Sequence, residues 1–133
     1  MVHTCKEGVW HKDELFDIAA IKLGHLKMPG YRLCIGAESV QSGAKLKLED
    51  CGRSALQLWH YNNYRLSLKA HPDKCLTIGI EASRLTRGGK RLPSKHLARS
   101  LVLAACSEAG SERQLWRFEA PQKRSGPILP FLK

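Results

Sequence analysis

The sequence has no apolar run long enough to cross a membrane or to form the core of a signal peptide. A membrane-spanning helix needs about 18 or more consecutive apolar residues, and none of the 133 residues begins such a run. The first eight residues likewise hold no apolar stretch of signal-peptide length. We therefore expect no membrane insertion, and no signal peptide within this chain.

Motifs that carry catalysis or bind metal are also missing. The six histidines are scattered, without H-E-x-x-H or H-x-H spacing, and no two cysteines form a C-x-x-C pair. Neither a Gly-x-Ser-x-Gly nucleophile motif nor a Gly-x-x-x-x-Gly-Lys phosphate-binding loop occurs. These absences predict a protein that is not an enzyme and that holds no metal or cofactor.

Acidic residues are few compared with basic ones. Lys and Arg number 22 against 12 Asp and Glu, which gives a formal net charge of +10. An excess of this size favours an anionic partner, such as nucleic acid, acidic lipid, sulfated glycan or an acidic protein face. The alternative is a charge that serves solubility alone.

A cysteine followed by a tryptophan recurs three times along the chain. The second and third copies end in the same tripeptide, Gln-Leu-Trp, which contains Gln57 and Gln114. The pairs are Cys5 with Trp10, Cys51 with Trp59, and Cys106 with Trp116. Repetition at a loose period of this kind predicts an architecture assembled from similar units.

Short segments of alternating apolar and polar residues precede or separate these pairs. They cover residues 33–36, 44–50, 64–69, 74–79 and 100–105. Period-two segments punctuated by Gly, Asn and Pro are typical of short antiparallel strands. An alternative for residues 12–26 is a helix with Leu15, Ile18, Ala19 and Leu26 on one face.

Three strand–cysteine–strand–tryptophan units predict an all-β chain folded as a β-trefoil. A single unit cannot bury its own apolar face, so three units close one common core, with the recurrent tryptophans as large core side chains. We expect one domain over residues 1–119, with lobes at about 1–30, 31–70 and 71–119. Residues 120–133, with Pro127 and Pro130, are expected to form an irregular tail.

The two Gln-Leu-Trp tripeptides, together with Cys75-Leu76-Thr77 and the cysteine spacing, resemble the repeat of the ricin B-type lectin family. Within that family, Trp10, then Leu15-Phe16, then Cys34-Ile35-Gly36 are most similar to the cysteine-rich domain of mannose-receptor-type proteins. The lectin domains of polypeptide N-acetylgalactosaminyltransferases are the other similar group. The resemblance implies a carbohydrate-binding receptor domain.

The resemblance also implies disulfides between Cys34 and Cys51 and between Cys75 and Cys106. The family partner of Cys5 would lie upstream of Met1, so the first lobe looks truncated at its N-terminus. Disulfides suit an extracellular or secretory location, as part of a longer protein. The alternative is a cytosolic chain in which all five cysteines are reduced.

In this family a sugar-binding lobe uses an acidic residue, an aromatic ring and an asparagine, none of which is retained here at its position. Those positions hold Gly36, Glu49 and Leu56 in the second lobe and Thr77, Ala104 and Arg113 in the third. The standard galactose site is therefore absent. Mannose-receptor-type relatives recognise sulfated N-acetylgalactosamine through a different site. In this chain, the residues interpreted as structural are Trp59, Trp116, Gln57 and Gln114.

A basic insertion over residues 83–99 lengthens the third lobe. It is expected to be an exposed, irregular loop because it contains Gly88-Gly89 and Pro93, and it has no acidic residue and no aromatic ring. Its cations are Arg84, Arg87, Lys90, Arg91, Lys95 and Arg99. They suit an anion-binding site, since guanidinium groups bind sulfate or phosphate bidentately; the alternative is a solvated loop without a ligand.

These observations predict a non-catalytic, lectin-like module that favours anionic or sulfated glycans over neutral galactose. One alternative is a structural or protein-interaction trefoil that has lost sugar binding, which the six changed positions favour. Binding of nucleic acid or another polyanion ranks below both, because the basic loop lacks the aromatic side chains on which bases stack.

Overall fold

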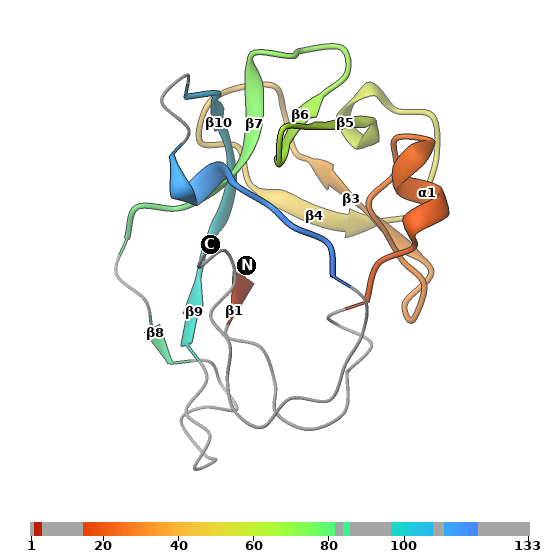
Figure 1. Ribbon diagram of the computed structural model, residues 1–133, viewed down its shortest axis with the longest axis horizontal. Helices are drawn as coiled ribbons and strands as arrows, with labels where there is room; N and C mark the ends of the chain where they lie inside the picture. Colours follow the sequence, from red (N-terminus) through yellow and green to blue (C-terminus); the bar gives the residue numbers. More distant parts are fainter. Residues whose placement is uncertain (1, 4–14, 82–83, 86–96, 108–110, 120–133) are drawn as a thin grey trace.

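The computed structural model describes residues 2–3, 15–81, 84–85, 97–107 and 111–119. This part of the chain is almost entirely β-structure, and every strand pair is antiparallel, so the all-β class is confirmed (Figure 1). The strands are β1 (Val2–His3), β2 (Lys27–Met28), β3 (Leu33–Ala37), β4 (Leu46–Glu49), β5 (Trp59–Asn62), β6 (Arg65–Leu68), β7 (Lys74–Ile78), β8 (Arg84–Leu85), β9 (Leu97–Arg99) and β10 (Leu101–Ala105).

The strands form three small sheets. One contains β2, β3 and β4, a second has the order β10-β7-β6-β5, and the third has the order β1-β9-β8. All five segments with alternating apolar residues form strands, as predicted. In β6 the alternation is visible in burial: Leu66 and Leu68 are buried, whereas Arg65 and Ser67 are only half-buried, because successive side chains of a strand point to opposite faces.

The basic insertion leaves and rejoins the domain at one end of the β7–β10 ladder, which runs from Ile78 opposite Leu101 to Lys74 opposite Ala105. The expectation of an irregular loop is wrong at both ends of the insertion. Arg84 and Leu85 form β8, which pairs with β9, and β9 also pairs with β1 from the start of the chain. The centre of the insertion, residues 86–96, lies outside the described residues, as do Trp10, Cys5 and the tail 120–133.

The proposed helix over residues 12–26 is replaced by a much shorter one, α1 (Ile18–Lys22), on the side of the molecule away from β8 (Figure 1). It begins after Asp17, whose carboxylate accepts hydrogen bonds from the amides of Ala19 and Ala20. It ends before Gly24, whose φ of 97° is the left-handed conformation that glycine adopts most easily. Ile18 is exposed and Ile21 is only partly buried against the core, so the helix contributes no fully buried side chain.

The buried apolar side chains of the core come mainly from β3, β5, β6, β7 and β10. Partly buried residues from both ends of the described chain, including Phe16 and Phe118, pack against it, with their rings 5.9 Å apart. The core thus joins residues that are distant in sequence. Its buried members are Leu26, Ala37, Trp59, Leu66, Leu68, Leu76, Ile78, Leu103 and Trp116.

Replacing Leu68 with alanine is expected to lower the free energy of unfolding by about 2–5 kcal/mol, because the side chain is fully buried and its removal leaves a cavity. Leu48→Ala on β4 is the matched control, and its exposed side chain predicts a loss below about 0.5 kcal/mol. Urea unfolding of both variants measures the difference. Equal losses would contradict the assignment of the core.

Candidate functional site

Each of the two units that the structure describes contains a 3₁₀ turn before its tryptophan. The first turn, η2 (Ala55–Gln57), begins after Ser54, whose hydroxyl accepts a hydrogen bond from the following turn at 3.2 Å. The second, η3 (Glu112–Gln114), begins after Ser111, which caps it in the same way at 3.3 Å. A serine cap satisfies an amide that the start of the turn leaves free. The same local signal therefore places the glutamine of each unit.

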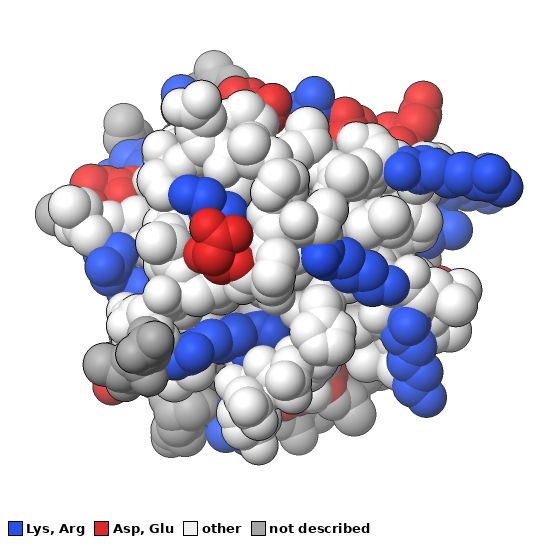
Figure 2. Space-filling view, turned by 90° about the horizontal axis from the view of Figure 1, so that it is seen from above, with Lys and Arg blue, Asp and Glu red and all other residues white. Residues whose placement is uncertain are grey.

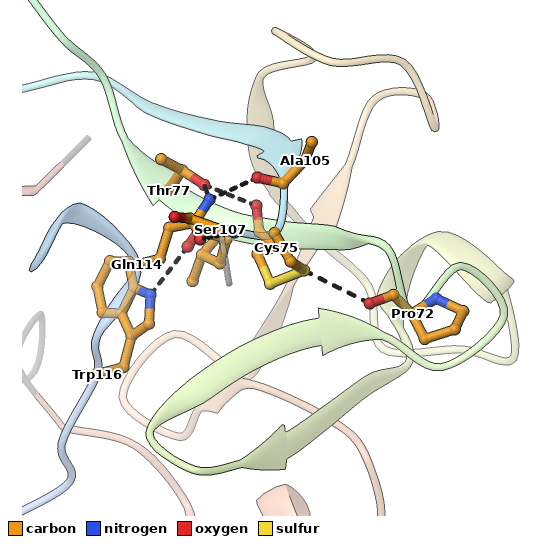
Figure 3. Close-up of a disulfide and its surroundings, with 9 residues drawn as sticks. Pro72, Cys75, Thr77, Ala105, Ser107, Gln114 and Trp116 are labelled. Atoms are coloured by element: carbon orange, nitrogen blue, oxygen red, sulfur yellow. Dashed lines mark hydrogen bonds between the residues drawn. A yellow bond between two sulfur atoms is a disulfide. The ribbon is translucent and has the colours of Figure 1, made fainter. Parts of the chain in front are cut away.

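The glutamine of each turn holds the chain on both sides of a cysteine. Gln57 accepts a hydrogen bond from the amide that follows Cys51 and donates one to the carbonyl that precedes it, both at 2.8 Å. Gln114 makes the same two bonds around Cys106, also at 2.8 Å (Figure 3). Both glutamines are buried. One amide group thus satisfies a backbone donor and a backbone acceptor at each disulfide.

The tryptophan two residues later is part of the core. Trp59 donates from Nε1 to the carbonyl of Ile35 at 2.9 Å, and Trp116 donates to the carbonyl of Leu76 at 3.0 Å. These carbonyls belong to equivalent strands, β3 and β7. Trp116 is only 9% exposed, so its ring is not a surface on which a sugar can stack.

Each disulfide ties together neighbouring strands of one unit. Cys34 is bonded to Cys51 and Cys75 to Cys106, which is the pairing that the resemblance implies; Figure 3 shows the second of the two bonds. Each bond links the first strand of a unit to the end of the strand beside it, and contributes a few kcal/mol, about 2–4 in typical cases. Two disulfides indicate an oxidising environment.

In the second unit the three family positions for sugar binding come together but are filled. A β-carbon added to Gly36 would lie 2.5 Å from the Glu49 carboxylate and 3.3 Å from the carbonyl of Leu56. Glu49 also lies 3.2 Å from Lys47. A hydrogen bond from Gln57, with a smaller contribution from Lys47, lowers the pKa of Glu49 below its ordinary value. The carboxylate of Glu49 therefore interacts with the buried side chain of Gln57.

In the third unit, Thr77 interacts with the buried glutamine of its own unit. The hydroxyl of Thr77 accepts a hydrogen bond from the Gln114 amide at 3.1 Å and donates one to the carbonyl of Cys75 at 2.9 Å (Figure 3). Thr77 is buried. Its polar groups are thus directed into the protein. Thr77 thus accepts the second amide proton of Gln114, whereas in the second unit the carboxylate of Glu49 lies next to Gln57.

Two arginines are hydrogen-bonded to backbone carbonyls at the end of β7. Arg99 donates from Nη2 to the carbonyl of Gly79 at 2.6 Å, and Arg113 donates from Nη1 to the carbonyl of Ile78 at 3.0 Å. Two guanidinium groups are therefore fixed on consecutive carbonyls. Within the described residues, Nε of Arg99 is buried and has no hydrogen-bond partner, and the same holds for Nε of Arg65.

A carboxylate that the sequence reasoning overlooked lies beside these arginines. Glu81 accepts hydrogen bonds from the amide of Ser100 at 2.6 Å and from its hydroxyl at 2.8 Å, and it lies 3.7 Å from Arg84. The hydrogen bonds from Ser100, helped by Arg84, lower the pKa of Glu81. Glu81 lies two residues before the start of the insertion and three residues before Arg84. This spacing could have suggested the ion pair between Glu81 and Arg84.

Of the six predicted anion-binding residues, Arg99 is hydrogen-bonded to the carbonyl of Gly79 at the end of β7, and Arg84 lies next to Glu81. The other four, Arg87, Lys90, Arg91 and Lys95, lie outside the described residues. The face shown in Figure 2 has Lys and Arg side chains spread among uncharged and acidic residues. On that face the positive charge does not form one continuous patch.

No family of proteins, no curated protein and no solved structure matches this chain. In the described part of the chain, no three His, Cys, Asp or Glu side chains are grouped so as to hold a metal ion. No helix of the described residues is long and apolar enough to span a membrane.

The two ways of satisfying the glutamine should be interchangeable. Glu49→Ala is expected to cost about 1 kcal/mol, because it removes an acceptor of the Gln57 amide. Gly36→Thr alone should also destabilise, since its β-carbon would crowd Glu49. The double variant reproduces the arrangement of Thr77 and should be more stable than either single variant. Denaturant unfolding of all four proteins measures this coupling, and additive losses would contradict it.

Glu81→Gln is expected to make stability less dependent on pH. Because hydrogen bonds lower the pKa of Glu81 in the folded state, its contribution is fully present above the ordinary pKa of a glutamate. The contribution is lost as the pH falls through the lowered pKa. Urea unfolding across this acidic range should therefore show a smaller loss for Glu81→Gln than for the unchanged protein. The exposed Glu38→Gln is the control, and the same profile for both variants would contradict the assignment.

Proposed function

We propose that the chain is a non-catalytic binding module of the ricin B-type β-trefoil family that recognises carbohydrate and favours anionic, sulfated glycans. The trefoil is supported by the equivalence of the second and third units in their disulfide, serine cap, buried glutamine and buried tryptophan. A first unit with Trp10 would complete the threefold arrangement. Secretion fits the two disulfides.

The observation that carries the choice of an anionic ligand is the anchoring of Arg99 and Arg113 on the consecutive carbonyls of Ile78 and Gly79. A guanidinium group fixed through one nitrogen keeps its other N–H groups for two oxygens of a sulfate group. The remaining basic residues of the insertion would add attraction without fixing the geometry.

A structural or protein-interaction trefoil is the second candidate, and the filled family positions favour it. Glu49 and Thr77 each bind the buried glutamine of their own unit. Neither unit retains a free carboxylate and a ring for a neutral sugar at those positions. Nucleic-acid binding rests on net charge alone and ranks third.

A glycan array with sulfated and neutral sugars side by side tests the proposal. At about 150 mM salt, weak surface electrostatics are screened, and we expect selective binding to sulfated glycans. Arg99→Ala should weaken this binding about tenfold or more, because a charge-assisted hydrogen bond is lost. Arg53→Ala, which removes the same charge from an exposed site on the second unit, is the matched control.

A blank array from a demonstrably folded protein would reject carbohydrate binding and leave the protein-interaction alternative. Equal weakening by Arg99→Ala and Arg53→Ala would mean that net charge, and not the anchored arginine, attracts the glycan. Arg99→Lys separates the two effects further, since it keeps the charge and removes the planar fork.

A further inference from the structure

The turn between β5 and β6 presents three consecutive exposed side chains: Asn62, Asn63 and Tyr64. Tyr64 is 59% exposed, the highest exposed fraction of any aromatic side chain that the structure describes. Within the described residues, neither asparagine amide nor the Tyr64 hydroxyl has a hydrogen-bond partner. The turn thus combines an aromatic ring with two unused amide groups.

The backbone of this turn does not favour a tyrosine. Asn63 has a φ of 50° and Tyr64 a φ of 64°, in the left-handed region where a β-carbon crowds its own backbone. Asparagine tolerates this conformation, whereas glycine is the usual residue at the second position of such hairpin turns. The side chain of Tyr64 is therefore held in place at an energetic cost.

The preceding unit shows that the fold itself accepts glycine at the equivalent position. The carbonyl of Gly24 accepts a hydrogen bond from the Trp59 amide at 2.7 Å, and the carbonyl of Tyr64 accepts one from the Trp116 amide at 2.7 Å. Gly24 also has a positive φ, of 97°. Since glycine meets the same backbone requirement, the tyrosine ring has no structural necessity, and strain of this kind is typical of functional positions.

We propose that Asn62, Asn63 and Tyr64 form a contact site for an uncharged pyranose sugar. The apolar face of the sugar ring would stack on Tyr64, and its hydroxyls would bind the two amides. An amide both donates and accepts, as a sugar hydroxyl does, and none of the three side chains carries a formal charge. This site shares only the class of ligand with the proposed function, since it uses neither the arginines of β7 nor the family's sugar-binding positions.

The turn is rigid, which lowers the entropy lost on binding. Asn62 pairs with Arg65 across the two-residue loop. Tyr61 donates from its hydroxyl to the carbonyl of Trp116 at 2.6 Å, so the hairpin is bound to Trp116 through both Tyr61 and Tyr64. A protein partner fits less well, because a protein interface buries a broad apolar core around such a ring, and the neighbours of Tyr64 in the sequence, Asn63 and Arg65, are both polar.

Nuclear magnetic resonance titration of the full chain tests the proposal. The probes are the methyl glycosides of galactose, glucose, mannose and N-acetylgalactosamine at millimolar concentration. We expect at least one of them to shift the side-chain amide signals of Asn62 and Asn63. Tyr64→Gly should weaken this binding about tenfold or more, and Asn63→Gly, which preserves the backbone conformation, should weaken it as well. Tyr31→Ala, at another exposed tyrosine, should leave it unchanged.

The melting temperature distinguishes a binding role from a structural one. Tyr64→Gly should melt at the same temperature as the unchanged protein or higher, because it relieves the strained φ. A lower melting temperature would overturn the argument from strain. Absence of shifts at the turn with every probe, or unchanged binding by Tyr64→Gly, would overturn the site itself.

The outcome is separable from the test of the proposed function. Arg99→Ala should retain binding of the neutral glycoside, and Tyr64→Gly should retain binding of sulfated glycans on the array. Neutral sugar bound without sulfated glycans would uphold this site and reject the anionic preference. Binding of sulfated glycans without binding of any neutral glycoside would uphold the anionic preference and reject the site at the turn.

Discussion

Two buried glutamines, each fixed next to a disulfide, are the interaction on which the rest of the structure depends. Gln57 and Gln114 each join the amide and the carbonyl that flank a cysteine. A buried backbone group without a partner is costly, so the chain can turn away from the sheet at these points only because the side-chain amide satisfies it. The tryptophan two residues later is thereby directed into the core.

The second N–H of each glutamine amide determines whether the neighbouring sugar-binding positions of the family are available to a ligand. In the second unit it engages Glu49, and in the third it engages Thr77. These residues occupy two of the positions from which the resembled family would bind galactose. A residue bound to a buried amide is not free to bind a sugar hydroxyl, so stability and loss of the standard sugar site have the same cause.

The distribution of charge is less simple than the net excess of +10 indicates. Arg84 lies against Glu81, whereas Arg99 and Arg113 are anchored on backbone carbonyls. Anchored guanidinium groups lose little freedom when they bind an oxyanion, and this gives them more selectivity than cations without such anchors. The neutral turn at Tyr64 differs in chemistry from this cluster, and the two sites predict responses to different sugars.

The sequence by itself determined the all-β class and the position of the strands at 33–36, 44–50, 64–69, 74–79 and 100–105, because the alternation of apolar residues is a local property that the pleated strand imposes. It also determined that Gln57, Gln114, Trp59 and Trp116 are structural, through their repetition. Only the tertiary structure decided that the insertion begins and ends in β8 and β9, and that α1 is short. It alone brought Arg99 and Arg113 to one end of β7 and made Tyr64 equivalent to Gly24. These features depend on backbone dihedral angles and on contacts between residues distant in sequence, which no local pattern encodes.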